Sequence, residues 1–331
     1  MIKKVLVTGA AGFIGSHLCE ELVKNNYKVK ALVHYNSSYY LHNLKYLDEK
    51  TFNKLEIISG DIIDEDFCKK IMEDVDAVLH LAALISIPYS YIAIKPFIYT
   101  NIIGTENLLR AALEKKIKLF IHTSTSETYG TAEYVPIDEK HPLKGQSPYS
   151  ATKIGADKIV ESYVKSFNLP AIIIRPFNTF GPRQSQRAVI PTIIAQTLVN
   201  DKYIMLGNLE PIRDLNFVKN TVKGYILALN TDLSNHFGEV FNISYGEGIS
   251  IKELAETIIN ISGKNLKIKI DEKRIRPAKS EVMKLVGDFT KAQKILGYKP
   301  DISLTEGLKI TYEWFKNFYN KKTEIMKKYI V

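Results

Sequence analysis

The chain has few cysteines and no long apolar run, and both shortages exclude whole classes of protein. Cys19 and Cys68 are its two cysteines, and neither belongs to a C-x-x-C pair or a metal-ligand spacing. We therefore expect a reducing compartment, no disulfide framework and no metal site. The longest apolar run, residues 78–87, is interrupted by His80 and Ser86 and is shorter than the roughly 18 residues that span a membrane. The sequence predicts a cytoplasmic protein without a membrane partner.

Concentrated positive charge is also missing, although the formal net charge is +9. No block of roughly five or six basic residues occurs, and arginines do not alternate with aromatic residues as on a stacking platform. Much of the excess is lysine on expected helix surfaces and in the tail, residues 316–328. We interpret it as solvated surface and expect no nucleic-acid partner, with a few arginines left to hold a small anionic ligand.

A glycine motif opens the chain. An expected strand, residues 3–7, leads into G-x-x-G-x-x-G and then into a helix with apolar residues along one face. Glycines in this context permit a tight turn and let backbone N–H groups approach a pyrophosphate at the helix N-terminus. The motif therefore predicts a dinucleotide site. The residues expected to bind the cofactor here are Gly9, Gly12, Phe13, Ile14 and Gly15.

An acidic residue is missing from the end of the second expected strand, residues 28–33, which should meet the adenosine ribose. An acid there favours NAD and a basic residue favours NADP, but residues 34–38 (HYNSS) contain neither an acid nor an arginine. The choice between NAD and NADP stays open on this evidence. The expected contacts of this segment are His34, Asn36 and Ser37.

Two further strands, residues 55–59 and 77–82, also end in candidate cofactor contacts. Ligands of an open parallel sheet bind outside the carboxyl ends of its strands. Asp61 could equally be a turn or helix-cap residue, and Asn101 in the next helix is either a site residue or a buried packing amide. The cofactor contacts expected after these strands are Asp61, Ile62, Leu81, Ala82 and Ala83.

Tyr149 and Lys153 form a candidate catalytic pair. Residues four apart lie on one face of a helix, so the Lys153 ammonium can sit beside the Tyr149 phenol. A nearby cation lowers the pKa of a phenol, and such a tyrosine can accept a proton from a sugar hydroxyl near neutral pH. A bare Y-x-x-x-K is usually an ordinary surface pair, so the assignment depends on the rest of the chain.

The motifs TGAAGFIG, GDI, HLAA, STSETYG, YSATK and RPFNTFGPR follow one another along nearly the whole chain. Together they resemble the extended short-chain dehydrogenase/reductases, the nucleotide-sugar epimerases and dehydratases. The resemblance implies an α/β fold: a Rossmann doubly wound parallel sheet with a smaller α/β substrate-binding lobe. Residues 1–175 would form mainly the NAD(P)-binding domain and residues 176–331 mainly the nucleotide-sugar lobe, with a strand at residues 240–243 returning to the main sheet. NAD or NADP would stay tightly bound and be recycled.

The same resemblance suggests which residues hold a nucleotide-diphosphate sugar. Arg213 and Arg276 look like diphosphate clamps, a task that suits bidentate guanidinium groups. Asn178 looks like a sugar or phosphate contact, and Arg183 of the same motif is also expected to bind the substrate. The helices near residues 105–114 and 149–165 could pair with their copies in a homodimer or higher homo-oligomer, as in the family, or face their own core.

The triplet Thr125-Ser126-Glu127 resembles that of sugar-nucleotide 4,6-dehydratases. The form with serine in the middle is similar to the triplet of the GDP-mannose enzymes. Tyr149, supported by Lys153, would deprotonate the C4 hydroxyl while hydride leaves C4. Glu127 would remove the C5 proton, and Ser126 would assist loss of the C6 hydroxyl. The hydride would return to C6.

Three questions stay open on the sequence. The whole chain looks most like bacterial dehydratases of GDP- or UDP-linked N-acetylglucosamine on the way to legionaminic-type nonulosonic acids, but no residue distinguishes guanine from uracil. A 4-epimerase would use Thr125, Tyr149 and Lys153 and leave Glu127 idle. A non-catalytic cofactor-binding regulator is the alternative of another class.

Overall fold

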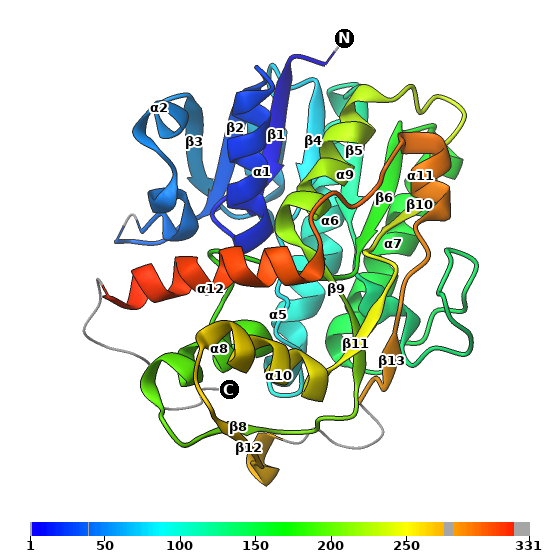
Figure 1. The fold of residues 1–331 in the computed structure, drawn as a ribbon. Coiled ribbons are helices and arrows are strands. Elements are labelled where there is room, and N and C mark those ends of the chain that lie inside the picture. Colours follow the sequence, from blue (N-terminus) through cyan, green and yellow to red (C-terminus); the bar gives the residue numbers. More distant parts are fainter. Residues whose placement is uncertain (1, 39, 275–280, 321–331) are drawn as a thin grey trace.

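A parallel sheet of seven strands forms the centre of the computed structural model (Figure 1). The structure describes residues 2–38, 40–274 and 281–320. The strand order is β10-β6-β5-β4-β1-β2-β3, and every neighbouring pair is parallel. This arrangement confirms the predicted Rossmann sheet. The strands are β1 (Lys4–Thr8), β2 (Lys28–His34), β3 (Leu55–Gly60), β4 (Ala77–His80), β5 (Leu119–Thr123), β6 (Ala171–Pro176) and β10 (Val240–Ile243).

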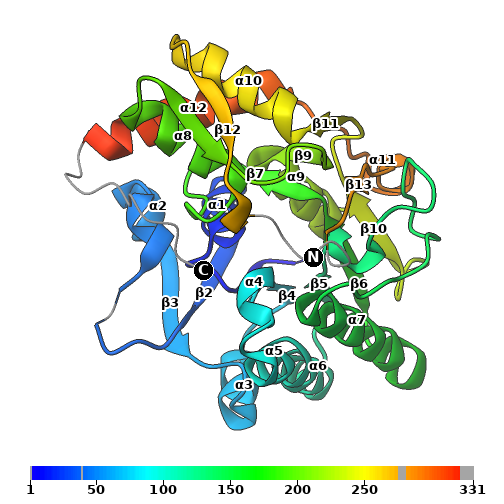
Figure 2. The ribbon, with the colours of Figure 1, turned by 90° about the horizontal axis from the view of Figure 1, so that it is seen from below.

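Both faces of the sheet are covered by helices, because its strands are apolar on both sides. Val5 and Val7 of β1 belong to one buried cluster, whereas Leu6 between them belongs to another. Figure 2 shows α1 (Phe13–Lys24) and α9 (Val218–Asn230) on one side of the sheet. On the other side lie α3 (Glu65–Ile71), α6 (Gly104–Glu114) and α7 (Pro148–Phe167).

Helix α7 begins and ends with residues that fix its position. Ser147 and Ser150 form a capping box at its N-terminus, and Pro148 occupies the first turn. Asn168 ends the helix in the left-handed conformation. This well-capped start places Tyr149 in the first turn and Lys153 one turn later, on the same face.

A smaller lobe lies beyond the carboxyl edge of the sheet (Figure 1). Its strand β9 (Ile212–Phe217) pairs with β7 (Asn178–Phe180), β11 (Gly248–Ser250) and β13 (Lys284–Leu285), while β8 (Tyr203–Leu206) pairs with β12 (Lys267–Ile270). Its helices are α8 (Val189–Val199), α10 (Ile251–Ser262) and α12 (Leu304–Asn320), with α11 (Thr290–Leu296) beside β10. The shorter elements are η1 (His42–Tyr46), α2 (Glu49–Phe52), α4 (Ile87–Ser90), α5 (Ile94–Ile98), η2 (Tyr99–Ile103), η3 (Ser126–Tyr129) and η4 (Glu272–Arg274).

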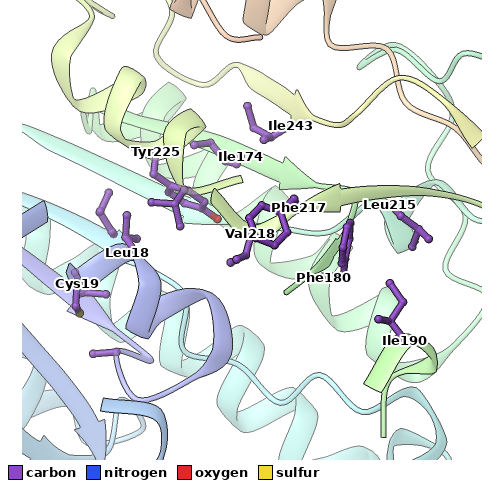
Figure 3. Close-up of a cluster of buried hydrophobic side chains, with 14 of the residues drawn as sticks. Leu18, Cys19, Ile174, Phe180, Ile190, Leu215, Phe217, Val218, Tyr225 and Ile243 are labelled. Atoms are coloured by element: carbon purple, nitrogen blue, oxygen red, sulfur yellow. The ribbon is translucent and has the colours of Figure 1, made fainter. Parts of the chain in front are cut away.

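One apolar core joins the sheet to this lobe (Figure 3). Leu18 of α1, Ile174 of β6 and Ile243 of β10 belong to the same buried cluster as Phe180 and Phe217 of the lobe. The rings of Phe180 and Phe217 pack edge to face, with centroids 5.6 Å apart. The continuous core fixes the lobe against the carboxyl ends of the strands. Among the described residues, no helix combines the length and the apolar character that crossing a membrane requires.

Asp214 ties three segments of the lobe together. Its Oδ1 accepts a hydrogen bond from the Tyr245 N–H at 2.8 Å, and its Oδ2 accepts from the N–H groups of Gly246 at 2.8 Å and Gly287 at 3.2 Å. Burial raises the pKa of Asp214 to about 7, although the three N–H groups oppose the rise.

We expect Asp214→Asn to lower the free energy of unfolding by about 1–3 kcal/mol, because an amide cannot accept all three bonds and leaves a buried donor unpaired. Denaturant unfolding followed by circular dichroism measures the loss. Asp232→Asn is the control, since this exposed carboxylate accepts a hydrogen bond from the N–H of nearby Ser234 and its loss should cost less than about 0.5 kcal/mol. Equal stability of the two variants would contradict this role for Asp214.

Candidate active site

A cavity of about 1160 Å³ lies between the carboxyl ends of the central strands and the smaller lobe. The segments that follow β1 to β6 all contribute to its wall, as expected for a ligand site of an open parallel sheet. The predicted site residues that line it are Gly9, Gly12, Phe13, Ile14, Gly15, His34, Asp61, Ile62, Leu81, Ala82, Ala83, Thr125, Ser126, Glu127, Tyr149, Lys153, Asn178 and Arg183.

The glycine loop at the start of α1 has no room for side chains. Gly9 has a φ of +69°, and a Cβ there would lie 2.8 Å from the backbone nitrogen of Ala82. A Cβ on Gly15 would lie 2.2 Å from the carbonyl oxygen of Gly9. The loop is therefore packed against the end of β4, and its backbone faces the cavity at the N-terminus of α1. This cradle fits the diphosphate of a dinucleotide.

We expect Gly9→Ala to remove bound dinucleotide, because the new Cβ would press against Ala82 and strain a left-handed backbone. The nucleotide content of the purified protein, released by denaturation and quantified by chromatography, measures this. Gly263→Ala is the matched control, since Gly263 has a φ of +70° but nothing within 4 Å of its Cβ position. Equal dinucleotide content in both variants would contradict the role of the Gly9 turn.

The segment after β2 is only partly at the cavity. His34 lines it, and its Nε2 lies 3.4 Å from Oδ2 of Asp61. Asp61 also accepts a hydrogen bond from the Ile63 N–H at 3.0 Å. Asp61 is therefore a turn residue that also lines the cavity. Asn36 lies outside the lining and is occupied by hydrogen bonds within its own loop, to residues 34, 38 and 40. Ser37 also lies outside the lining.

Asn101 is a buried packing amide. Its Oδ1 accepts from the Leu84 N–H at 2.9 Å, and its Nδ2 donates to the Leu84 carbonyl and to Thr152 Oγ1, each at 3.0 Å. With a fully buried side chain, Asn101 braces the loop after β4 against α7. This resolves the alternative that the sequence left open.

The triplet and Tyr149 meet at one wall of the cavity. Thr125 is the extended N-cap of η3, and its Oγ1 accepts a hydrogen bond from the Glu127 N–H at 3.2 Å. This turn directs Ser126 and Glu127 into the same cavity that Tyr149 reaches from the first turn of α7. A hydroxyl, a carboxyl group and a phenol therefore line one wall, which suits repeated proton transfer to a single bound substrate.

The expected fall in the pKa of Tyr149 is wrong. Burial raises the pKa of its phenol, the hydrogen bond with Thr125 opposes the rise, and the charges of Glu127 and Asp157 add to it. The sequence could not show that Tyr149 is only 7% exposed. It also could not show that Nζ of Lys153 hydrogen-bonds with Nε2 of His122, 3.5 Å away.

Of the two diphosphate clamps suggested by the resemblance, Arg213 does not line the cavity. Asn178 and Arg183 line it, and Arg183 Nη2 donates to Glu20 of α1 at 2.8 Å. Arg213 lies outside the lining, and its Nη2 donates to Glu281 at 3.1 Å. Arg276 lies outside the described residues. The cavity wall includes Arg274, two positions earlier in the chain, which no sequence motif singled out.

Sequence reasoning also missed an aromatic wall at one end of the cavity. Trp314 and Phe318 of α12 stack with centroids 5.2 Å apart, and Tyr46 meets both rings edge on. No local motif marks these residues, because α12 and η1 are far apart in the chain. The amphipathic pattern of α12 would have predicted only a packed helix.

The family of the chain follows from comparison with known proteins. Residues 6–311 match the family model described as GDP-mannose 4,6 dehydratase. The chain belongs to this family. The match confirms the resemblance to extended short-chain dehydrogenase/reductases that act on nucleotide sugars.

Its relatives in the family include both dehydratases and epimerases. Human dTDP-D-glucose 4,6-dehydratase is 32% identical, with 97% of this chain and 92% of that protein covered. A UDP-glucuronic acid 4-epimerase from Bacillus cereus, crystallised with a fluorinated UDP-sugar and NAD, has a TM-score of 0.87 at 33% identity, covering 96% and 100% of the two chains. A dTDP-glucose 4,6-dehydratase from Streptomyces venezuelae with NAD bound has a TM-score of 0.83 at 27% identity, covering 96% and 98%.

Proposed function

We propose that this member of the family is a nucleotide-sugar 4,6-dehydratase that converts an NDP-hexose to its 4-keto-6-deoxy form. The observation that carries the proposal is the place of Glu127, whose side chain lines the same cavity as Tyr149 and Ser126. Epimerisation at C4 gives a carboxyl group at this position no task, whereas dehydration needs a base for the C5 proton.

The cofactor we propose is NAD or NADP, tightly bound in the Gly9–Gly15 cradle and recycled. When bound, it would accept the hydride of C4 and later return it to C6. The protein's own part is to hold the reacting groups and to move protons. In the loaded enzyme, the charges of Lys153 and of the nicotinamide would favour the phenolate of Tyr149 and so oppose the effect of burial. This phenolate takes the proton of the C4 hydroxyl, and Thr125 keeps the phenol in place through the hydrogen bond between them.

The remaining proton transfers fall to the rest of the triplet. A ketone at C4 acidifies the C5 proton, which the carboxylate of Glu127 removes. The C6 hydroxyl leaves as water with a proton delivered through Ser126 or Glu127, and Glu127 finally returns a proton to C5. The protons taken from the C4 hydroxyl and from C5 supply the one that leaves in water and the one that returns to C5. The hydride moves from C4 to C6, so the net change is loss of one water.

A 4-epimerase is the second candidate, and the fold similarity to the Bacillus cereus epimerase favours it. It would use Thr125, Tyr149 and Lys153 without a task for Glu127. The two reactions differ in the mass of the product, since epimerisation leaves the mass unchanged.

The substrate we propose is GDP- or UDP-linked N-acetylglucosamine. Incubation of the purified protein with each nucleotide sugar, without added cofactor and followed by mass spectrometry, tests both parts of the proposal. Loss of one water without net formation of NADH is the expected result, and the nucleotide sugar that is accepted identifies the nucleobase of the substrate. An unchanged mass with altered sugar stereochemistry would support the epimerase instead.

We also propose that the chain forms a homodimer through the side of the sheet that carries α6 and α7. Next to these helices, residues 85–103 expose large apolar side chains, more than a monomer usually leaves in water. A dimer by size-exclusion chromatography with light scattering is expected, and a monomer at all concentrations would contradict it. The exposed side chains are Ile85, Tyr89, Tyr91, Ile92, Ile94, Ile98, Tyr99 and Ile103.

A further inference from the structure

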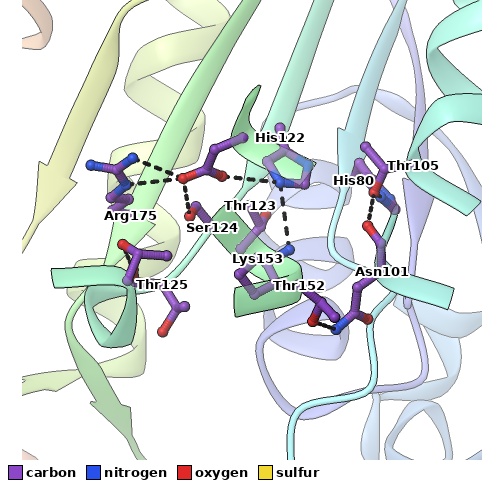
Figure 4. A network of polar contacts seen from close by, with 12 residues as sticks. His80, Asn101, Thr105, His122, Thr123, Ser124, Thr125, Thr152, Lys153 and Arg175 are labelled. Carbon is purple, nitrogen blue, oxygen red and sulfur yellow. Dashed lines mark hydrogen bonds and ion pairs between the residues drawn. The ribbon is translucent and has the colours of Figure 1, made fainter. Parts of the chain in front are cut away.

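A buried chain of polar side chains connects Lys153 with Arg175 (Figure 4). Nε2 of His122 lies 3.5 Å from Nζ of Lys153 and 3.4 Å from Oδ1 of Asp157. The other carboxylate oxygen, Oδ2, accepts hydrogen bonds from Nη2 of Arg175 at 2.8 Å and from Ser124 Oγ at 2.7 Å. None of the five side chains is more than 5% exposed. His122, Asp157 and Arg175 lie outside the cavity lining, so the proposed chemistry gives them no direct task.

The two neighbours of His122 compete for one ring nitrogen. Burial and the charge of Lys153 lower the pKa of His122 to about 4, so its ring is neutral and carries one N–H. A charged ammonium only donates, so its hydrogen bond to Nε2 requires the lone pair there and the ring proton on Nδ1. Contact between Nε2 and the carboxylate of Asp157 requires the opposite tautomer, with the proton on Nε2. The charge of Lys153 and the tautomer of His122 are therefore linked.

We propose that His122 and Asp157 are positioning residues for Lys153: Nε2 of His122 holds the charged ammonium by accepting its hydrogen bond, and the carboxylate of Asp157 keeps this buried ammonium protonated. When Lys153 loses its proton, the ring proton of His122 moves from Nδ1 to Nε2 and is donated to Asp157. The inference rests on the proposed function, in which Lys153 supports Tyr149.

Asp157 is held as an anion at this point. Burial acts to raise its pKa, but the contact with His122 and the charge of Arg175 outweigh burial and lower the pKa to about 2. Burial lowers the pKa of Lys153 to about 8, and the charge of Asp157 opposes the fall. Loss of that charge should therefore deprotonate Lys153 at lower pH.

The other titratable groups around Lys153 do not replace Asp157. His80 of β4 stays neutral because burial holds its pKa well below the usual range. Both of its ring nitrogens are engaged, Nδ1 with Thr8 at 2.8 Å and Nε2 with Thr105 at 2.9 Å. Tyr149 lies one turn earlier on α7, and Glu127 of η3 acts on that phenol.

Nitrogen-15 NMR of the full chain labelled at its seven histidines tests the linkage without any turnover. His122→Phe identifies the signals of His122. As the pH rises from about 6 to about 10, we expect the ring proton of His122 to move from Nδ1 to Nε2. The midpoint should lie at about pH 8, the pKa of Lys153. A proton that stays on Nε2 throughout would overturn the proposal.

A pH profile of turnover tests the part of Asp157. Asp157→Asn should shift the alkaline limb of kcat by about one pH unit or more to lower pH. Ser124→Ala is the matched control, since it removes a hydrogen bond from the same carboxylate but leaves its charge, and the limb should stay in place. An unmoved limb in Asp157→Asn would overturn the role of the carboxylate. If Asp157→Asn does not fold, the NMR titration of the unaltered chain decides.

The two tests separate this inference from the proposed function. A tautomer that follows pH in a protein without dehydratase activity would overturn the function and leave the linkage standing. Dehydratase activity with the His122 proton fixed on Nε2 would overturn the linkage and leave the function standing.

Discussion

Glu127→Gln is expected to reduce dehydration by about 10²–10⁴-fold while oxidation at C4 continues, because an amide cannot take the C5 proton. The variant should accumulate the 4-keto sugar together with reduced nicotinamide, visible as new absorbance in a single turnover. The C5 position should also stop exchanging with deuterated solvent. Glutamine keeps the size of the side chain, so the cavity should retain its shape.

The matched control is Glu133→Gln in the loop that follows η3. Glu133 is exposed and forms an ion pair with Lys144, away from the cavity lining. Its loss should leave every step unchanged, since a surface ion pair contributes little. Wild-type rates of water loss in Glu127→Gln would contradict the role of Glu127, because another group would then have to remove the C5 proton.

Tyr149→Phe is expected to reduce the first step, oxidation at C4, by about 10²–10⁴-fold, because the C4 hydroxyl then has no proton acceptor. The lost hydroxyl lies in a buried position and hydrogen-bonds with Thr125. Pre-steady-state formation of reduced nicotinamide measures the effect. Substrate affinity should change much less, since the ring and its packing remain.

Tyr225→Phe separates this effect from a general loss of stability. Tyr225 is fully buried and does not line the cavity. Its hydroxyl lies 2.8 Å from Oγ1 of another threonine, Thr123. Both variants lose a buried hydroxyl and a hydrogen bond of about 0.5–1.5 kcal/mol. Normal turnover is expected in Tyr225→Phe alone. Equal loss of turnover in the two variants would contradict the role of Tyr149.

The features that the sequence predicted well are those carried by short spacings. Three glycines between a strand and a helix define a backbone turn by themselves, and the structure packs that turn against Ala82. Tyr149 and Lys153 share a helix face because four residues make about one turn. The strands expected at residues 3–7, 28–33, 55–59 and 77–82 agree with β1 to β4 within a few residues, while the complete sheet was implied by the family resemblance.

The features that it missed depend on contacts between distant segments. The pKa of Tyr149 is raised because the folded chain buries the phenol, and no spacing reveals burial. His122 and Asp157 are 35 positions apart and meet only when β5 lies beside α7. Trp314 reaches the cavity from the last described helix. Arg213, expected at the diphosphate, instead pairs with Glu281, a partner 68 residues away.

The fate of the C4 hydrogen tests the central claim most directly. A nucleotide sugar labelled with deuterium at C4 would be turned over and its product analysed by NMR and mass spectrometry. The account predicts a product lighter by one water that carries the deuterium on its C6 methyl group. Deuterium that remains at C4 in a product of unchanged mass would contradict the account and identify an epimerase.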